Sequence, residues 1–152
     1  MSPRHVCQDV MRFVPLLRLD QDLHSAAWEV IGARVPALPV VDGARKHVGI
    51  FGEREFIGAF FPGYLGELRY AAFVPDSLDE ALERRSQCAR EPVSKYMNTE
   101  HVDASPHCSD AQLAETFLHH RVLIVPIVER GEVKGIVTRW DFFKAVAERL
   151  RP

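Results

Sequence analysis

The feature that most constrains this sequence is a pattern of apolar strands that occurs twice at a nearly constant offset. Residues 38–41 read Leu-Pro-Val-Val and residues 125–128 read Val-Pro-Ile-Val, and each run is followed by a turn and then by Gly-Ile. The prolines lie 87 positions apart (126 − 39), and the glycines of the Gly-Ile pairs lie 86 apart (135 − 49). Self-similarity at a fixed period indicates a duplicated structural unit.

Both halves contain the same order of expected elements. In the first half we expect a short strand at 16–19, a helix capped by Asp20 or Asp22, strands at 38–41 and 47–51, and a helix over 53–60. In the second half we expect a short strand around Val102, a helix capped by Ser109, strands at 122–128 and 133–137, and a helix that begins near Thr138. The sequence therefore predicts two β-α-β-β-α units.

Composition limits the classes of partner. The 152 residues, 47% hydrophobic and 26% charged, suffice for one globular domain or two small halves that pack together. The net charge of −2 comes from intermixed acids and bases, so nothing favours nucleic acid or an anionic membrane as the main partner. We find neither an apolar run of membrane-spanning length nor a signal peptide, and we expect a cytoplasmic protein without membrane insertion.

Catalytic and metal-binding patterns are missing from the sequence. The three cysteines, Cys7, Cys88 and Cys108, have no metal-ligand spacing, so we expect reduced and packed thiols. There is no nucleophile elbow, phosphate-binding P-loop, dinucleotide-binding glycine pattern or paired-carboxylate spacing. We expect no enzyme, no catalytic residue, no catalytic cofactor and no metal.

Thr138 and Asp141 allow two readings. Three positions apart at the start of the last helix, they have nearly the spacing of a capping box, with Asp in place of Glu or Gln. The same geometry suits a ligand, because a helix N-terminus offers free N–H groups to an anion and a carboxylate accepts hydrogen bonds from two sugar hydroxyls. The two readings are compatible.

The stretch Gly135-Ile136-Val137-Thr138-Arg139-Trp140-Asp141 resembles the Gly-x-x-Thr-x-x-Asp signature for adenosine nucleotides in tandem CBS domain pairs, also called Bateman modules. The two proline-containing strands and their Gly-Ile pairs resemble the same family, over nearly the whole chain apart from its middle. The resemblance implies an α+β fold in which two pseudo-symmetric β-α-β-β-α CBS repeats pack as one module. We assign the first repeat to residues 8–60, an aromatic-rich helical insert with a connecting helix to 61–91, and the second repeat to 92–152.

The resemblance also implies a ligand site in the second repeat. Asp141 would take the ribose hydroxyls and Thr138 would lie beside the ribose-phosphate, with Arg139 among the nearby cations. The adenine would slot between apolar strand positions, which are Val102, Val125, Pro126 and Ile136, unless these four only pack in the core.

The first repeat departs from the signature. Gly52 stands in place of the threonine and Glu55 in place of the aspartate, so we expect one good site and one weak or empty site. Leu123 and Ile124, and Pro36 and Ala37 in the first repeat, replace a basic pair of many family members, which favours a monophosphate or nucleoside-like ligand over a triphosphate.

These features predict a stand-alone regulatory module that binds AMP, ADP or a related adenosine ligand. With no catalytic or transport domain in the sequence, the module would signal to a separate, unidentified partner protein, and the family resemblance implies a homodimer. The alternative is a scaffold or interaction module with degenerate pockets. The aromatic insert would pack on its own module, cover the ligand or form a partner surface.

Overall fold

The computed structural model describes residues 5–61, 77–100 and 102–150. The elements of the first part of the chain are α1 (Val6–Val10), β1 (Leu17–Arg18), α2 (Leu23–Ala33), β2 (Ala37–Val41), β3 (His47–Gly52) and α3 (Glu53–Phe60). Those of the second part are α4 (Leu78–Arg84), two 3-10 turns (Ser86–Arg90 and Val93–Lys95), α5 (Asp110–His120), β4 (Ile124–Glu129), β5 (Glu132–Thr138) and α6 (Arg139–Glu148).

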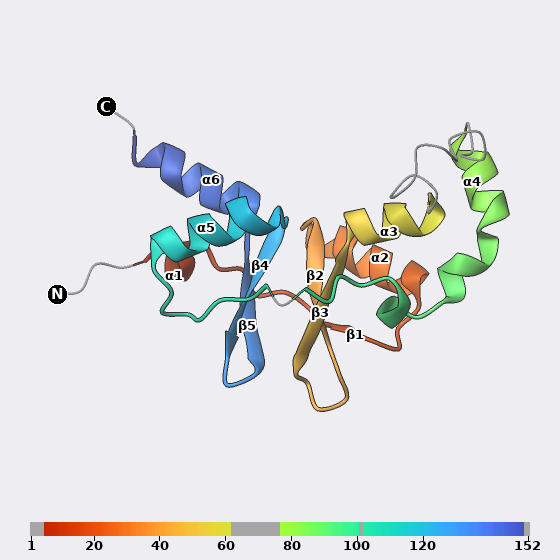
Figure 1. Cartoon of the computed structure of the whole chain (residues 1–152), viewed down its shortest axis with the longest axis horizontal. Helices are drawn as coiled ribbons and strands as arrows, with labels where there is room; N and C mark the ends of the chain where they lie inside the picture. Colours follow the sequence, from red (N-terminus) through yellow and green to blue (C-terminus); the bar gives the residue numbers. More distant parts are fainter. Residues whose placement is uncertain (1–4, 62–76, 101, 151–152) are drawn as a thin grey trace.

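Two small sheets lie side by side at the centre of the molecule, and the helices flank them (Figure 1). In the first sheet β1 runs parallel to β2, which is antiparallel to β3. In the second, β4 is antiparallel to β5, and a parallel bridge from Ala104 to Ile127 takes the place of β1. The predicted α+β fold with two β-α-β-β-α repeats is confirmed.

The two repeats share irregularities of the backbone as well as helices and strands. Each hairpin shifts register at the same place, between Val40 and Val41 in the first and between Ile127 and Val128 in the second. The first helix of each repeat ends at an arginine with positive φ, at Arg34 (57°) and Arg121 (54°). Left-handed backbone at a non-glycine residue is uncommon, so its recurrence supports a duplicated unit.

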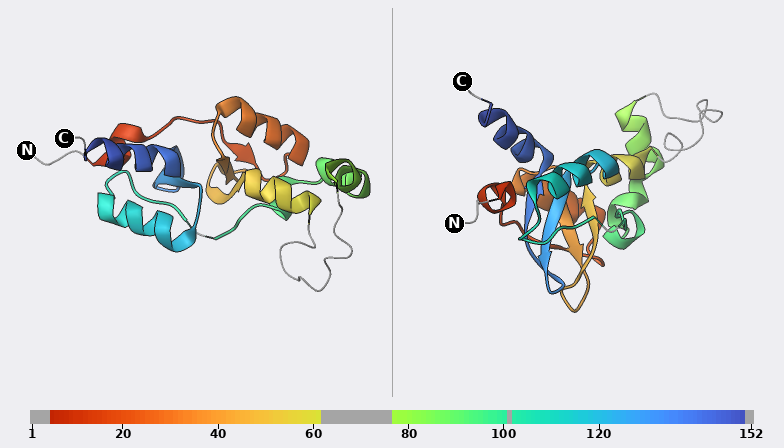
Figure 2. Two further views of the ribbon diagram at one scale, coloured as in Figure 1. Left: turned by 90° about the horizontal axis from the view of Figure 1, so that it is seen from above. Right: turned by 60° about the vertical axis from the view of Figure 1, so that its left-hand side comes forward.

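The segment that leads into each repeat pairs with the other repeat's sheet. Arg12, upstream of β1, exchanges two backbone hydrogen bonds with Ile136 of β5, with N···O distances of 2.8 and 2.9 Å. Asn98, in the equivalent position of the second repeat, makes the same pair of bonds with Ile50 of β3, at 2.8 and 2.9 Å. The two lead-in segments cross between the halves on opposite sides of the module (Figure 2).

The helix α1 precedes the first repeat in sequence but packs against α5 and α6 of the second. The backbone N–H of Val6 donates to the Asp110 carboxylate at 2.8 Å, and Asp9 lies 4.0 Å from the Arg149 guanidinium. From α1 the chain therefore crosses from one half to the other before β1, as Figure 1 shows.

The core is shared between the repeats. One buried cluster joins Leu17, Leu38 and Phe51 of the first repeat to Ile124 and Ile136 of the second. A second cluster, which includes Leu113, Val125 and Val137, lies within the second repeat and takes in Cys7 from α1. The three cysteines are buried free thiols, as predicted.

The predicted aromatic insert falls largely outside the described residues, since positions 62–76 are not described. Its helical end is described as α4, which begins with the Glu80 N–H donating to the Ser77 hydroxyl at 3.1 Å. Within the described parts of the chain, no helix has both the length and the apolar character needed to cross a bilayer.

Candidate functional site

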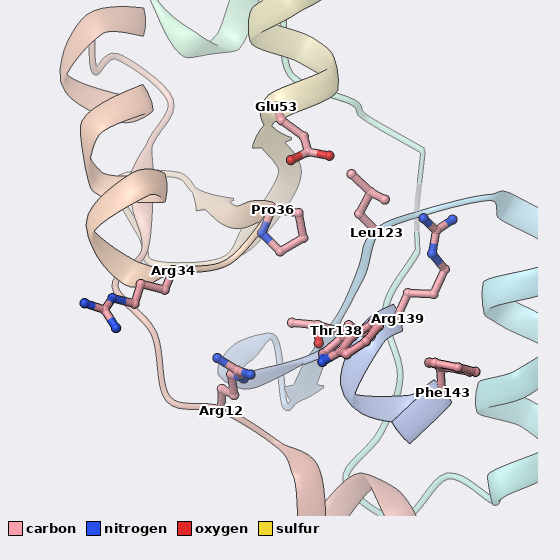
Figure 3. Close-up of a pocket in the computed structure, with 9 residues that line it drawn as sticks. Arg12, Arg34, Pro36, Glu53, Leu123, Thr138, Arg139 and Phe143 are labelled. Atoms are coloured by element: carbon pink, nitrogen blue, oxygen red, sulfur yellow. The ribbon is translucent and has the colours of Figure 1, made fainter. Parts of the chain in front are cut away.

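A cavity of about 620 Å³ lies between the two repeats, beside the start of α6. Its lining residues are Arg12, Arg34, Pro36, Glu53, Leu123, Thr138, Arg139, Trp140 and Phe143. Figure 3 shows Pro36 and Leu123 facing each other across the gap, with Glu53 at one end and Arg12 at the other.

Equivalent positions of the two repeats form the walls of this cavity. In the second repeat the Arg139 N–H donates to the Leu123 carbonyl at 2.9 Å, which fixes the start of α6 against the start of β4. In the first repeat the Glu53 N–H donates to the Pro36 carbonyl at the same distance and fixes α3 against β2. The cavity therefore lies where the two pseudo-symmetric strand-to-helix junctions meet.

Thr138 caps α6. It is only 4% exposed, and its hydroxyl accepts a hydrogen bond from the Asp141 N–H at 3.0 Å. The capping role predicted from the sequence is confirmed for Thr138. The remaining N–H groups of the first turn give this edge of the cavity a partial positive charge, which suits an anion.

The Asp141 carboxylate pairs with Arg12 rather than with the helix end. The Arg12 guanidinium donates through Nε to Oδ2 at 2.6 Å and through Nη2 to Oδ1 at 2.9 Å, a two-point contact across 129 positions of sequence. The hydrogen bond from Arg12 holds the pKa of Asp141 below its ordinary value, and Thr138 adds to this effect. Asp141 is thus a charged and largely buried carboxylate, with a side chain 14% exposed.

Arg12 separates Asp141 from the cavity. Thr138 lines the cavity, whereas Asp141 lines a neighbouring hollow of about 240 Å³ together with Val10 and Lys144. Arg12 lines both spaces. The two residues of the sequence signature therefore lie on either side of one arginine side chain.

The remaining predicted site residues divide into two groups. Arg139 lines the cavity and extends alongside Leu123 (Figure 3). Val102, Val125, Pro126 and Ile136 are buried in the core, and none of them lines this cavity.

The first repeat shows why its signature differs. A Cβ atom at Gly52 would lie 2.2 Å from the Pro36 carbonyl oxygen and 2.4 Å from the Ala37 Cα, so no larger residue fits there. The Glu55 carboxylate turns back to accept from the Gly52 N–H at 2.9 Å, and burial raises its pKa. Glu55 therefore closes its own helix end.

Sequence reasoning missed several lining residues. Trp140 and Phe143, with ring centroids 5.5 Å apart, add an exposed aromatic wall. Nothing in the sequence indicated that Arg12 lines the cavity, because its position depends on the lead-in segment pairing with the sheet of the other repeat. Trp140 carried a signal, since it lies inside the Thr138–Asp141 stretch.

The electrostatics of the cavity favour an anion. Its charged lining residues are Arg12, Arg34 and Arg139 against the single acid Glu53. Figure 3 shows the Arg34 guanidinium directed away from the gap and that of Arg12 extending toward Thr138. Among the described residues there is no cluster of three or more His, Cys, Asp or Glu side chains that could hold a metal ion.

Comparison with known proteins identifies this architecture. Residues 93–148 match the family model described as "CBS domain". A crystal structure of the CBS domain of a CBS domain-containing membrane protein from Sphaerobacter thermophilus is 27% identical, covers 93% of this chain and 88% of its own, and superposes with a TM-score of 0.69. Residues 93–148 thus match the CBS domain family, and the chain as a whole has the fold of a tandem CBS pair.

Two more distant structures share the fold. CBSX2 in complex with AMP is 16% identical, with a TM-score of 0.70 over 97% of this chain and 99% of its own. The CBS domain pair of protein MJ0100, in complex with 5′-methylthioadenosine and S-adenosyl-L-methionine, is 19% identical with the same TM-score and coverages. None of the curated proteins matches the sequence significantly.

Proposed function

We propose that this protein is a regulatory module that binds an AMP- or ADP-like nucleotide in the cavity between its repeats and passes the ligand state to a partner protein. The observation that carries the proposal is the cavity itself, which combines the Thr138 helix end, arginine side chains and apolar walls. The related folds that are seen with AMP and with two other adenosine compounds support an adenosine ligand.

The lining provides for each part of such a ligand. Pro36 and Leu123, on opposite walls, and the Trp140 and Phe143 rings offer apolar surface to a flat base. The start of α6 and the arginines suit a phosphate. Asp141 is the carboxylate that we assign to the ribose hydroxyls, as its place in the signature predicts.

Regulation follows from the position of the cavity. A ligand held by Pro36 of one repeat and Leu123 of the other contacts both halves, so it favours the arrangement in which both walls are in place. We propose that this change in population alters affinity for a partner, with a homodimer as the working assembly.

Thermal unfolding with and without nucleotide tests the proposal. AMP at one hundred times its Kd should stabilise the wild type by about 2.7 kcal/mol, because it binds only the folded state. Asp141→Ala should lose this stabilisation. Asp20→Ala, which removes an exposed carboxylate that lies 3.5 Å from the Arg18 guanidinium, should keep it.

The scaffold function is the alternative outcome of the same experiment. If AMP, ADP and S-adenosylmethionine leave the unfolding temperature of the wild type unchanged, the nucleotide proposal is rejected. If AMP stabilises the wild type and Asp141→Ala equally, nucleotide binding stands but Asp141 is not the ribose ligand.

A further inference from the structure

Arg12 binds the Asp141 carboxylate, which by its place in the signature is expected to bind a sugar. Both oxygens of Asp141 accept from its guanidinium, at 2.6 and 2.9 Å. A ribose that bonds to Asp141 through two hydroxyls uses the same two oxygens, and although each oxygen has a second lone pair, the Arg12 side chain lies between the carboxylate and the cavity. The ribose and the Arg12 side chain therefore compete for one acceptor group.

The backbone of Arg12 is held by β5, whereas its side chain is partly exposed. Its N–H and carbonyl are both bonded to Ile136, whereas its side chain is 42% exposed. A guanidinium displaced from Asp141 has no need to leave the site, because Arg12 also lines the larger cavity between Thr138 and Arg34.

The consequence differs between ligands with and without a phosphate. A nucleoside that displaces Arg12 breaks a charge-assisted, two-point contact and gives the guanidinium no new anion. A nucleotide breaks the same contact and brings a phosphate, which accepts from a guanidinium with equally good geometry. Displacement is unfavourable in the first case and compensated in the second.

We infer that Arg12 determines ligand specificity: it holds Asp141 against unphosphorylated nucleosides and exchanges that carboxylate for the phosphate of a nucleotide. This inference rests on the proposed function and assigns its selectivity to a residue outside the signature. Hydrogen bonding from Arg12 also lowers the pKa of Asp141, which keeps the carboxylate charged and available for either partner.

Calorimetric titration with AMP and adenosine tests this selectivity. In Arg12→Gln, adenosine should bind about tenfold more tightly than to the wild type, because no cation must be displaced, while AMP should bind equally or more weakly. The Kd for adenosine divided by the Kd for AMP should therefore be at least tenfold smaller in Arg12→Gln than in the wild type. Arg12→Lys keeps the charge but not the two-point fork and should give an intermediate ratio.

Arg18→Gln is the matched control. Arg18 lies six positions after Arg12 in the sequence, and its side chain is 74% exposed. It lines neither the cavity nor the hollow beside Asp141. This variant should keep the wild-type ratio. A cooperative urea transition of each variant shows that it is folded, and the midpoint of Arg12→Gln should be the lower of the two because its contact with Asp141 is lost.

The possible failures are distinguishable. If AMP and adenosine bind the wild type and Arg12→Gln with the same ratio, or if adenosine binds the variant more weakly, the selectivity assigned to Arg12 is wrong while the proposed function stands. If neither compound binds the wild type or either Arg12 variant, both proposals fall. Adenosine binding to Arg12→Gln alone supports the inference directly.

Discussion

At the scale of single residues, one ion pair connects the chemistry of the site to the stability of the protein. Asp141 has a lowered pKa in the folded state because Arg12 donates hydrogen bonds to it. A carboxyl group with a depressed folded pKa stabilises the protein above its unfolded pKa, and this contribution is lost as pH falls through the folded value.

Acidification should therefore remove the contribution of the Arg12–Asp141 pair to the free energy of unfolding. The wild type should be more stable than Asp141→Asn at neutral pH, and the difference should disappear as pH falls below the ordinary value of 3.8. Urea midpoints of both proteins between pH 7 and pH 2.5 measure this. A difference that stays constant over the range would show that the pair does not set the pKa.

Gly52 should not tolerate the threonine of the signature. The threonine Cβ would lie within 2.4 Å of backbone atoms of residues 36 and 37, which are fixed by the start of β2. We expect Gly52→Thr to lower the free energy of unfolding by about 3 kcal/mol, as overpacking against backbone does.

Gly43→Ala is the control for this substitution, because a Cβ at Gly43 meets no atom within 4 Å. It should change the free energy of unfolding by less than about 0.5 kcal/mol. If Gly52→Thr is as stable as Gly43→Ala, the first repeat has room for a complete signature and its site is not closed by β2.

At the scale of elements, the helix starts show how local sequence positions the site. The helix α5 begins with a reciprocal capping box: the Ser109 hydroxyl accepts from the Gln112 N–H at 3.1 Å and the Gln112 side chain accepts from the Ser109 N–H at 2.9 Å. The helix α6 has only the first of these bonds, because Asp141 is bound to Arg12 instead.

Removal of the Ser109 hydroxyl should cost about 1 kcal/mol of stability, since one N–H of the first turn loses its acceptor. Denaturant unfolding of Ser109→Ala measures this cost. Ser94→Ala, at an exposed serine in a 3-10 turn, is the matched control and should be near neutral. Equal stability of the two variants would contradict a stabilising cap.

The elements were predictable to the extent that their signals are local. The helix over 53–60 was predicted with the bounds that the structure shows, because a Gly-Ile strand, a glycine and an amphipathic run define it within a few residues. The role of Thr138 as a cap was predictable for the same reason. The contact of Arg12 with Asp141 was not, because it depends on which sheet the lead-in segment joins.

The first hairpin illustrates a further limit. The strands expected at 38–41 and 47–51 predicted the connection 42–46 that the structure shows, but nothing in the Asp42-Gly43 pair indicated that the positive φ of this loop falls on Arg45 (64°). Three bonds accepted by Asp42, from the N–H groups of Ala44, Arg45 and Lys46, stabilise this loop. Side-chain acceptors of this kind can outweigh the preference of an Asp-Gly pair.

At the scale of the whole molecule, the shared core predicts that the repeats unfold together. The chain has two tryptophans, and they report on different halves: Trp28 lies on α2 and Trp140 on α6. Because Ile124 and Ile136 pack in the same cluster as Leu17, separating the halves would expose part of the core of each.

Single-tryptophan variants test this coupling. Trp140→Phe reports on the first repeat and Trp28→Phe on the second, and their urea transitions by fluorescence should have midpoints that coincide with those by circular dichroism. Separate midpoints in the fluorescence and circular dichroism of one variant would show that the halves unfold independently.

The crossing of the two lead-in segments has a consequence for how such a chain can arise. A protein with a single copy of this unit would lack the lead-in residue that bridges to its sheet. It would gain that residue only from a second molecule, if the two molecules exchanged their lead-in segments. Fusing two copies turns that bimolecular exchange into an internal one, which no longer depends on concentration. The tandem chain is in this sense a swapped dimer made permanent by a peptide link.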